Sequence, residues 1–136
     1  MADSPARSDA TMILDHIGFN VGSFATSKAF YVAALQPLGI GIAFEGEGWA
    51  MIGRNGKGQF WFGAFGPPPG SIHIAFAAAN RAQVRAFHGA ALAAGGRDNG
   101  APGLRPNYHP NYYGAFVLDP DGHNIEAVCH AAGEAP

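Results

Sequence analysis

The chain has 136 residues, which fits one domain, and 48% of them are apolar, enough to form a hydrophobic core. Its formal net charge is −2 and no basic stretch is interleaved with aromatic residues, so we expect no nucleic-acid partner. No apolar run approaches the roughly 20 residues of a membrane span, the N-terminus lacks a signal-peptide core, and Cys129 is a single cysteine, which together predict a cytoplasmic protein with no membrane partner.

Residues 1–11 are predicted to form a disordered tail, and the first strand follows them. In this strand apolar residues alternate with polar or small ones, so one face should pack against helices and the other should stay open. The helix side receives Ile17, Phe19 and Val21. The open side receives His16, Gly18 and Asn20.

A helix should start after Ser23, a good N-cap, and end near Gln36, because Pro37 cannot continue it. Three strands are then predicted, at Gly41–Phe44, Trp49–Gly53 and Gln59–Ala64. Residues 54–57 should form the hairpin turn between the last two, and Arg54 and Lys57 are expected to be solvated there.

The same order of elements recurs 57 residues later. Residues 16–39 and 73–96 align without a gap, and 10 of the 24 positions are identical, including His16 with His73 and Phe30 with Phe87. In the second copy Asn80 is the predicted N-cap, and residues 84, 87, 91 and 92 form one apolar stripe of a helix.

After the second helix, residues 97–112 are predicted to be irregular with one short strand. Strands at Tyr113–Leu118 and Asn124–Cys129 then flank a turn at residues 119–122. We therefore predict an α+β fold in which two βαβββ modules, residues 12–66 and 71–130, form a curled mixed or antiparallel sheet with helices on its outer face. Residues 131–136 should be a tail.

Three candidate metal ligands fall on the open face: His16, His73 and Glu126. Two neutral imidazoles and a carboxylate suit one divalent Fe, Mn, Co, Ni or Zn ion. A lone strand histidine or a late glutamate is more often structural or solvated. The equivalence of the two histidines in the repeat favours the ligand interpretation.

The loop at residues 105–113 is rich in aromatic and hydrogen-bonding groups and leads into the last hairpin. His109 and Tyr113 are candidate acid/base groups, and Arg105 and Tyr112 are candidate substrate-binding groups. The alternative is that the loop is an aromatic rim that closes the mouth of the sheet. The remaining histidines, His88, His123 and His130, are expected on the surface.

Three segments resemble the vicinal oxygen chelate superfamily, which includes glyoxalases, extradiol dioxygenases and bleomycin-binding proteins. These are LDHIGFNV at 14–21, SIHIAFAA at 71–78 and FVLDPDGHNIEAV at 116–128, of which DPDGHNIE is the most specific. The resemblance implies paired βαβββ modules around a metal bound by His16, His73 and Glu126. It also implies a small substrate that chelates the metal through adjacent oxygens, and a homodimer.

Glyoxalase-like members carry a fourth ligand, Glu or Gln, on the fourth strand. Aligning the closing hairpins at an offset of 65 puts Trp61 opposite Glu126, so that position holds a residue that cannot bind metal. Gln59, two residues earlier on the same face, is the candidate replacement, and Trp61 and Asn20 are candidate substrate contacts. The missing carboxylate disfavours a true glyoxalase I and resembles the two-His, one-carboxylate set of extradiol dioxygenases.

The sequence therefore leaves three hypotheses. The first is a metal-dependent enzyme, acting as a glyoxalase-like lyase or isomerase or as an extradiol-type dioxygenase. The second is a metal-free protein that sequesters a small molecule, like the bleomycin-binding members. The third is a degenerate domain that only dimerises. Few cations are available to hold glutathione, and Arg105 is the best placed of them.

Overall fold

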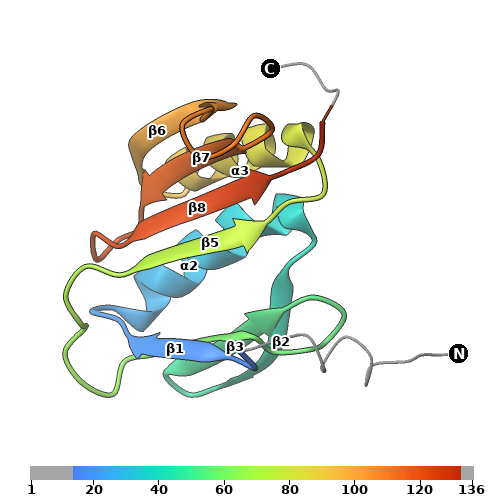
Figure 1. Cartoon of the computed structure of the whole chain (residues 1–136). Helices are drawn as coiled ribbons and strands as arrows, with labels where there is room; N and C mark the ends of the chain where they lie inside the picture. The colour runs from blue at the N-terminus through green and yellow to red at the C-terminus, as the bar shows by residue number, and fades with distance from the viewer. Residues whose placement is uncertain (1–13, 133–136) are drawn as a thin grey trace, which may run out of the picture.

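The computed structural model describes residues 14–132, so the predicted tail at 1–11 and residues 133–136 lie outside the described part of the chain. The first module comprises β1 (Ile17–Asn20), α2 (Phe24–Leu35), the 3-10 helix η1 (Gln36–Leu38), β2 (Gly41–Gly46), β3 (Trp49–Gly53) and β4 (Phe60–Gly63). The second comprises β5 (His73–Ala77), α3 (Arg81–Ala93), β6 (Arg97–Leu104), β7 (Tyr113–Leu118) and β8 (Asn124–Cys129) (Figure 1). No helix among residues 14–132 is long and apolar enough to cross a membrane.

Each module forms its own four-stranded mixed sheet, which confirms the predicted βαβββ pattern. The strand orders are β1-β4-β3-β2 and β5-β8-β7-β6, and in both sheets the first strand pairs in parallel with the last. The other pairings are antiparallel. Because β1 and β5 are both edge strands, the two sheets do not close into one barrel.

Local chemistry accounts for the ends of the elements. Ser23 and Asn80 cap the two helices by accepting hydrogen bonds from the backbone N–H groups of Thr26 and Gln83, as predicted. β6 differs from the prediction, because it is a strand of eight residues where an irregular stretch with one short strand was expected. Its sequence RDNGAPGL has low strand propensity, and its pairing with β7 shifts register on both sides of Gly100.

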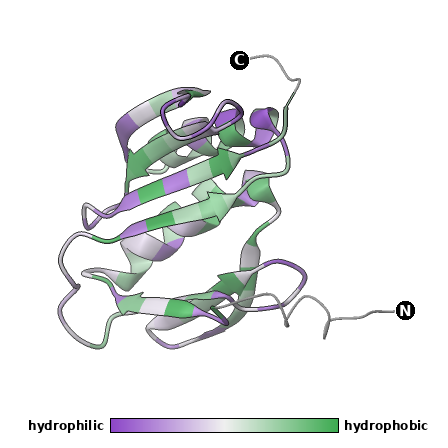
Figure 2. Ribbon diagram, in the orientation of Figure 1, coloured by the Kyte–Doolittle hydropathy of each residue, from purple (hydrophilic) through white to green (hydrophobic). Residues whose placement is uncertain are grey.

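The core lies between the sheets and the two helices, which pack against each other. Figure 2 shows that the apolar residues gather on the strands and helices, whereas the turns are polar. The predicted alternation holds for most strand residues: Phe19 and Val21 are buried on the helix side, as are Ile125 and Ala127. Ile17 is the exception, because its side chain remains 41% exposed.

The turn between β7 and β8 joins the two modules. The buried carboxylate of Asp119 accepts hydrogen bonds from the Tyr31 hydroxyl of α2 and from the backbone N–H of His123. Asp121 accepts from the backbone N–H of Gly22, at the start of the first module's helix segment. Burial raises the pKa of the Tyr31 hydroxyl far above its usual range, so this group is a permanent donor.

The expectation that His123 lies on the surface is wrong. Its side chain is 1% exposed, its ring packs on Phe19 of β1 with centroids 4.7 Å apart, and Nδ1 accepts a hydrogen bond from the N–H of Ile72. Composition alone marks a D-P-D-G turn as solvated, but this turn is covered by the other module.

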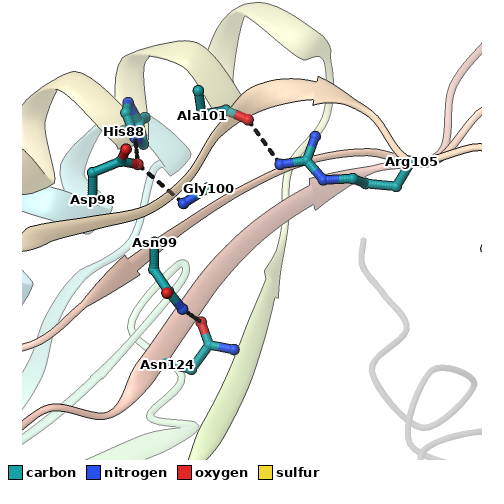
Figure 3. Close-up of polar contacts among 7 residues, drawn as sticks. All are labelled: His88, Asp98, Asn99, Gly100, Ala101, Arg105 and Asn124. Carbon is teal, nitrogen blue, oxygen red and sulfur yellow. Dashed lines mark hydrogen bonds and ion pairs between the residues drawn. The ribbon is translucent and has the colours of Figure 1, made fainter.

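His88 is also less exposed than expected, and it connects α3 to β6. Its Nε2 lies 2.9 Å from Asp98 Oδ1, and only 14% of its side chain is exposed (Figure 3). The same carboxylate oxygen accepts from the Gly100 N–H. The pair therefore holds the irregular start of β6 against the helix.

We predict that Tyr31→Phe lowers the free energy of unfolding by about 1.5–3 kcal/mol, because Asp119 loses a hydrogen bond in a buried setting. Urea unfolding followed by circular dichroism measures the change. Tyr108→Phe is the matched control, since Tyr108 is 61% exposed. Equal stability of the two variants would contradict a stabilising hydrogen bond between Tyr31 and Asp119.

We predict that Asp98 titrates below its usual pKa of 3.8, chiefly because His88 donates a hydrogen bond to it. A carboxyl pKa that is lower in the folded chain adds stability above the unfolded value and loses it as pH falls through the folded value. A carbon-detected NMR titration gives the midpoint. It should return toward 3.8 in His88→Ala and stay low in His109→Ala; an unchanged midpoint in His88→Ala would contradict this assignment.

Candidate functional site

The best-formed polar constellation joins His73 of β5 to Glu126 of β8. These strands run parallel with His73 beside Asn124 and Ala75 beside Glu126, so both side chains emerge on the open face of the second sheet. His73 Nδ1 lies 3.0 Å from the carbonyl oxygen of Asn124. A carbonyl can only accept, so Nδ1 carries the proton and Nε2 is left to face Glu126, with 3.1 Å between Nε2 and Oε1.

The Glu126 carboxylate that lies 3.1 Å from His73 Nε2 is both buried and hydrogen-bonded. Its carboxylate is 1% exposed, and the Tyr112 hydroxyl donates a hydrogen bond to Oε2. Burial, aided by this hydrogen bond, raises the pKa of Tyr112 to about 12, so the hydroxyl is a donor at neutral pH. Gly114 makes the arrangement possible, since a Cβ there would lie 3.1 Å from Oε2.

The facing atoms of His73 and Glu126 therefore need something positive between them. An unprotonated Nε2 and a carboxylate oxygen both present lone pairs, and they can approach only if a proton or a metal ion is shared. The second nitrogen of His73 is fixed by a backbone carbonyl, which is the usual support for a metal-binding histidine. The donor set thus fits a divalent cation.

His16 has the same internal arrangement but lies apart from this pair. Its Nδ1 is 2.8 Å from Asp15 Oδ1, which leaves Nε2 available, and the hydrogen bond from His16 lowers the pKa of Asp15 below its usual value. The side chain is 56% exposed, just before β1. Within residues 14–132, no three His, Cys, Asp or Glu side chains gather closely enough to hold one ion. His16 and His73 both line one hollow between the modules.

The pairing of the strands shows, without any sequence alignment, which residue of β4 is equivalent to Glu126 of β8. Trp61 pairs with Gly18 as Glu126 pairs with Ala75, so Trp61 occupies the first module's equivalent of Glu126. A Cβ at position 18 would lie 3.0 Å from the Trp61 side chain, so the indole covers this part of the sheet. Gln59 lies beside His16, since its carbonyl accepts from the Ile17 N–H, and its side chain lines the hollow shared by the histidines.

Two further hollows lie on the open faces of the sheets. In the first module His16, Asn20, Met51 and Trp61 border one of them. Asn20 also accepts a hydrogen bond from the Phe65 N–H, so its side-chain oxygen is engaged. In the second module the hollow lies over the His73–Glu126 pair and is bordered by Tyr112, together with Tyr108, Phe116 and Asn124.

The remaining candidates from the 105–113 loop take different places. Tyr113 is 1% exposed in the core, where its hydroxyl accepts from Arg85 of α3, so it lies on the opposite side of the sheet from Glu126. Arg105 donates to the carbonyls of Ala101 and Gly103 and lies over the Phe116 ring (Figure 3 shows the Ala101 bond). Its donors thus shape the end of β6.

His109 belongs to a small aromatic cluster at the rim. Its Nδ1 accepts from the Asn111 N–H, so Nε2 donates to Nδ1 of His130. The Tyr112 ring packs edge-on against both histidines and against Tyr108. The cluster therefore holds Tyr112 where its hydroxyl reaches Glu126.

Sequence reasoning did not find several supporting groups. Asp15 and the carbonyl of Asn124 orient the two histidines, and only the adjacency of Asp15 to His16 could have signalled one of them. Arg54, expected to be solvated, donates to the carbonyls of Leu38 and Ala77 and so ties the two modules together. Nothing local in the sequence signals that contact.

Comparison with known proteins places this arrangement in a family. Residues 13–127 match the model of the Glyoxalase/Bleomycin resistance protein/Dioxygenase superfamily. A glyoxalase/bleomycin resistance protein from Albidiferax ferrireducens T118 is 29% identical, with a TM-score of 0.75 over 88% of this chain and 100% of that one. A putative glyoxalase from Bacillus halodurans is 25% identical, with a TM-score of 0.66 over 88% of this chain and 96% of that one.

Glyoxalase I from Zea mays shares the fold, with a TM-score of 0.65 at 19% identity, over 88% of this chain and 45% of that one. Among curated proteins, no relative matches the chain. The family model covers nearly all of the described residues and both modules. The chain therefore belongs to the glyoxalase/bleomycin resistance protein/dioxygenase superfamily.

Proposed function

We propose that this protein is a metal-dependent enzyme in which His16, His73 and Glu126 bind one divalent ion and a small substrate chelates that ion through adjacent oxygens. The observation that carries the proposal is the approach of His73 Nε2 to 3.1 Å from the buried Glu126 carboxylate while Nδ1 is committed to a carbonyl. A shared cation relieves the repulsion between these two groups. Iron, manganese, cobalt, nickel and zinc all suit the donor set.

His16 is the proposed third ligand. It is exposed, it borders the same hollow as His73, and Asp15 orients its ring so that Nε2 is available. Binding of the ion would bring the edges of β1 and β5 closer together. Gln59, beside His16 on the same hollow, is the candidate fourth ligand through its side-chain oxygen.

The metal would supply Lewis-acid polarisation of a substrate oxygen and orientation of the chelating oxygens. Tyr112 holds one oxygen of Glu126 by its hydroxyl, which directs the other toward His73. Trp61 fills the position of the fourth-strand carboxylate, so the first module offers no second carboxylate base there. This favours an extradiol-type dioxygenase over a glyoxalase-like lyase or isomerase, and both remain within the proposal.

The alternative is a metal-free protein that sequesters a small molecule. The separation of His16 from the His73–Glu126 pair and the largely apolar hollow between the modules favour it. The close pairing of an oriented imidazole with a buried carboxylate favours the enzyme, because an apolar pocket gains nothing from a buried charge.

We also propose a homodimer. The open face of the first sheet carries an apolar row, because Phe44, Met51 and Trp61 lie at adjacent register positions. Phe44 is 59% exposed, and Phe65, stacked on Trp61, is 64% exposed. A second copy would remove these side chains from water.

The central prediction concerns metal content. Protein purified without chelator or nickel resin should carry close to one divalent ion per chain, measured by plasma mass spectrometry. His73→Ala and Glu126→Gln should lose nearly all of it, and His16→Ala should weaken binding by at least tenfold. His88→Ala is the control, since that histidine pairs with Asp98 and lines neither of the hollows that His73 borders.

Equal metal in the wild type and in all three site variants would contradict the enzyme and support the sequestering protein. With the metal identified, oxygen consumption with catechols and turnover of hemithioacetals separate the two reaction classes. Oxygen uptake that requires both the ion and Glu126 would assign a dioxygenase.

The dimer has its own test. Light scattering after size exclusion should give twice the chain mass of 14.1 kDa, and a Phe44→Ser/Phe65→Ser variant should shift toward the monomer. Val32→Gln, on the exposed side of α2, is the control because it leaves the sheet face intact. A wild-type monomer at tens of micromolar would contradict the homodimer.

A further inference from the structure

Two histidines outside the proposed ligand set form a stacked pair near Glu126. His109 lies in the loop between β6 and β7, and His130 directly follows β8. Their ring centroids are 4.8 Å apart with the planes at 24°, and His109 Nε2 lies 2.5 Å from His130 Nδ1. This histidine pair therefore connects the loop to the end of the strand that carries Glu126.

The histidine pair supports the side chain of Tyr112. The Tyr112 ring packs edge-on against both imidazoles, with its centroid 5.5 Å from that of His109 and 5.3 Å from that of His130. Its backbone N–H also donates to the His109 carbonyl oxygen, at 3.1 Å. The hydroxyl of the same ring donates to Oε2 of Glu126. A displacement of the histidine pair would therefore move the ring that holds the buried carboxylate.

The hydrogen bonds of the pair fix where its protons lie. The backbone N–H of Asn111 donates to His109 Nδ1 at 3.1 Å, so this nitrogen is unprotonated. The proton of the neutral His109 ring is then on Nε2, which donates to His130 Nδ1. Each ring thus uses its unprotonated nitrogen as a hydrogen-bond acceptor, and both rings are neutral.

An added proton has no place in this arrangement. On His109 it would occupy Nδ1 and face the Asn111 N–H, and on His130 it would occupy Nδ1 and face the His109 Nε2–H. Two donors would then oppose each other, so one hydrogen bond of the pair has to break. Histidine is the side chain that ordinarily changes charge between about pH 5 and 8, so this change falls in a mildly acidic range.

The groups around the pair supply no anion that would hold the added charge in place. Within residues 14–132, the carboxylates that pair with a histidine do so with His16, His73 and His88. Glu126 is reached only through the Tyr112 hydroxyl, and Arg105 is engaged with backbone carbonyls. The other titratable groups nearby are Tyr108, which packs on Tyr112, and Cys129, which accepts from the Ala131 N–H.

We propose that His109 and His130 are positioning residues that hold Glu126 through Tyr112 while both imidazoles are neutral and release it when either ring gains a proton. The order that the pair imposes is present at neutral pH and is lost as pH falls. The support of Tyr112 can be measured without metal. Its effect on metal affinity rests on the proposed function, because Glu126 is there a ligand.

The first test follows Tyr112 by NMR in the metal-free, full-length protein with carbon-13-labelled tyrosine. Between about pH 7.5 and pH 5.5 the Tyr112 ring resonances should shift together with those of the two imidazoles, because the ring leaves their edges. The Tyr112→Phe variant assigns the resonances. Tyr31, which is fully buried and bonded to Asp119, is the internal reference and should not move.

Variants of His130 separate its hydrogen bond from its charge. His130→Asn offers an oxygen to His109 Nε2 but does not titrate, so it should keep the neutral-pH resonances of Tyr112 and lose at least half of the acid shift. His130→Ala has no acceptor and should show a displaced Tyr112 at neutral pH. His88→Ala is the matched control, because His88 pairs with Asp98 on α3 and β6, and its acid shift should equal that of the wild type.

Cobalt affinity, measured by calorimetry at the same two pH values, tests the consequence for the proposed site. Protonation of the ligands themselves weakens binding alike in every variant, so the ratio of two affinities isolates the pair. Wild type and His130→Asn should bind equally at the higher pH. At the lower pH the wild type should bind at least threefold more weakly, since one hydrogen bond contributes about that factor.

Two NMR results overturn the inference and leave the proposed function standing. One is a Tyr112 ring that stays fixed between the two pH values, and the other is a shift as large in His130→Asn or in Tyr31 as in wild-type Tyr112. A cobalt affinity ratio that is the same at both pH values would overturn the link between the pair and the site. Failure of all variants to bind cobalt would overturn the proposed function alone, because the NMR test uses metal-free protein.

Discussion

The structure depends on one buried carboxylate, that of Asp119. It accepts the hydroxyl of Tyr31 from the first module and the backbone N–H of His123 from its own turn, so a single residue fixes the turn and ties it to α2. The same turn places His123 under the start of β5, where its Nδ1 accepts the Ile72 N–H. Residues 119–123 therefore join the modules and also bring His73 alongside Asn124 and Glu126. The segment most typical of the family, residues 119–126, thus combines the turn that joins the modules with the candidate ligand Glu126.

Much of this fold could be predicted from the sequence, because the repeat shows equivalent strands and helices twice in one chain. The βαβββ order of each module follows from local pattern and module equivalence. So do the N-caps at Ser23 and Asn80 and the strands Trp49–Gly53, Tyr113–Leu118 and Asn124–Cys129. β6 did not follow, because its glycines and Pro102 oppose a strand and only pairing with β7 imposes one. His123 and Arg54 were assigned to the surface because the Phe19 ring that covers His123 and the Ala77 carbonyl that accepts from Arg54 lie in the other module, which no local pattern reports.

In the candidate site, too, contacts within one module could be predicted from the sequence and contacts between the modules could not. His73 and Glu126 meet because both belong to one module, where strand register is a local consequence of the βαβββ unit. The distance between His16 and this pair depends on how two edge strands face each other, and within residues 14–132 β1 and β5 belong to separate sheets, so no strand pairing fixes that relation. Alternation predicts which face a ligand occupies. It does not predict how closely two separate sheets approach.

The two modules have diverged most where their symmetry would have made the chemistry equal. Gly18 with Trp61 and Ala75 with Glu126 are equivalent pairs, yet one module presents an indole over a glycine and the other a buried carboxylate held by Tyr112. Each substitution suits its surroundings, since the indole needs the space that glycine leaves and the carboxylate needs the donor that Tyr112 supplies. The hollow on the open face of the first module is therefore bordered by an indole, and the hollow on the open face of the second by a carboxylate. Because a buried carboxylate needs a donor or a cation and an indole needs neither, this one asymmetry confines the negative charge of the open faces to the side of His73.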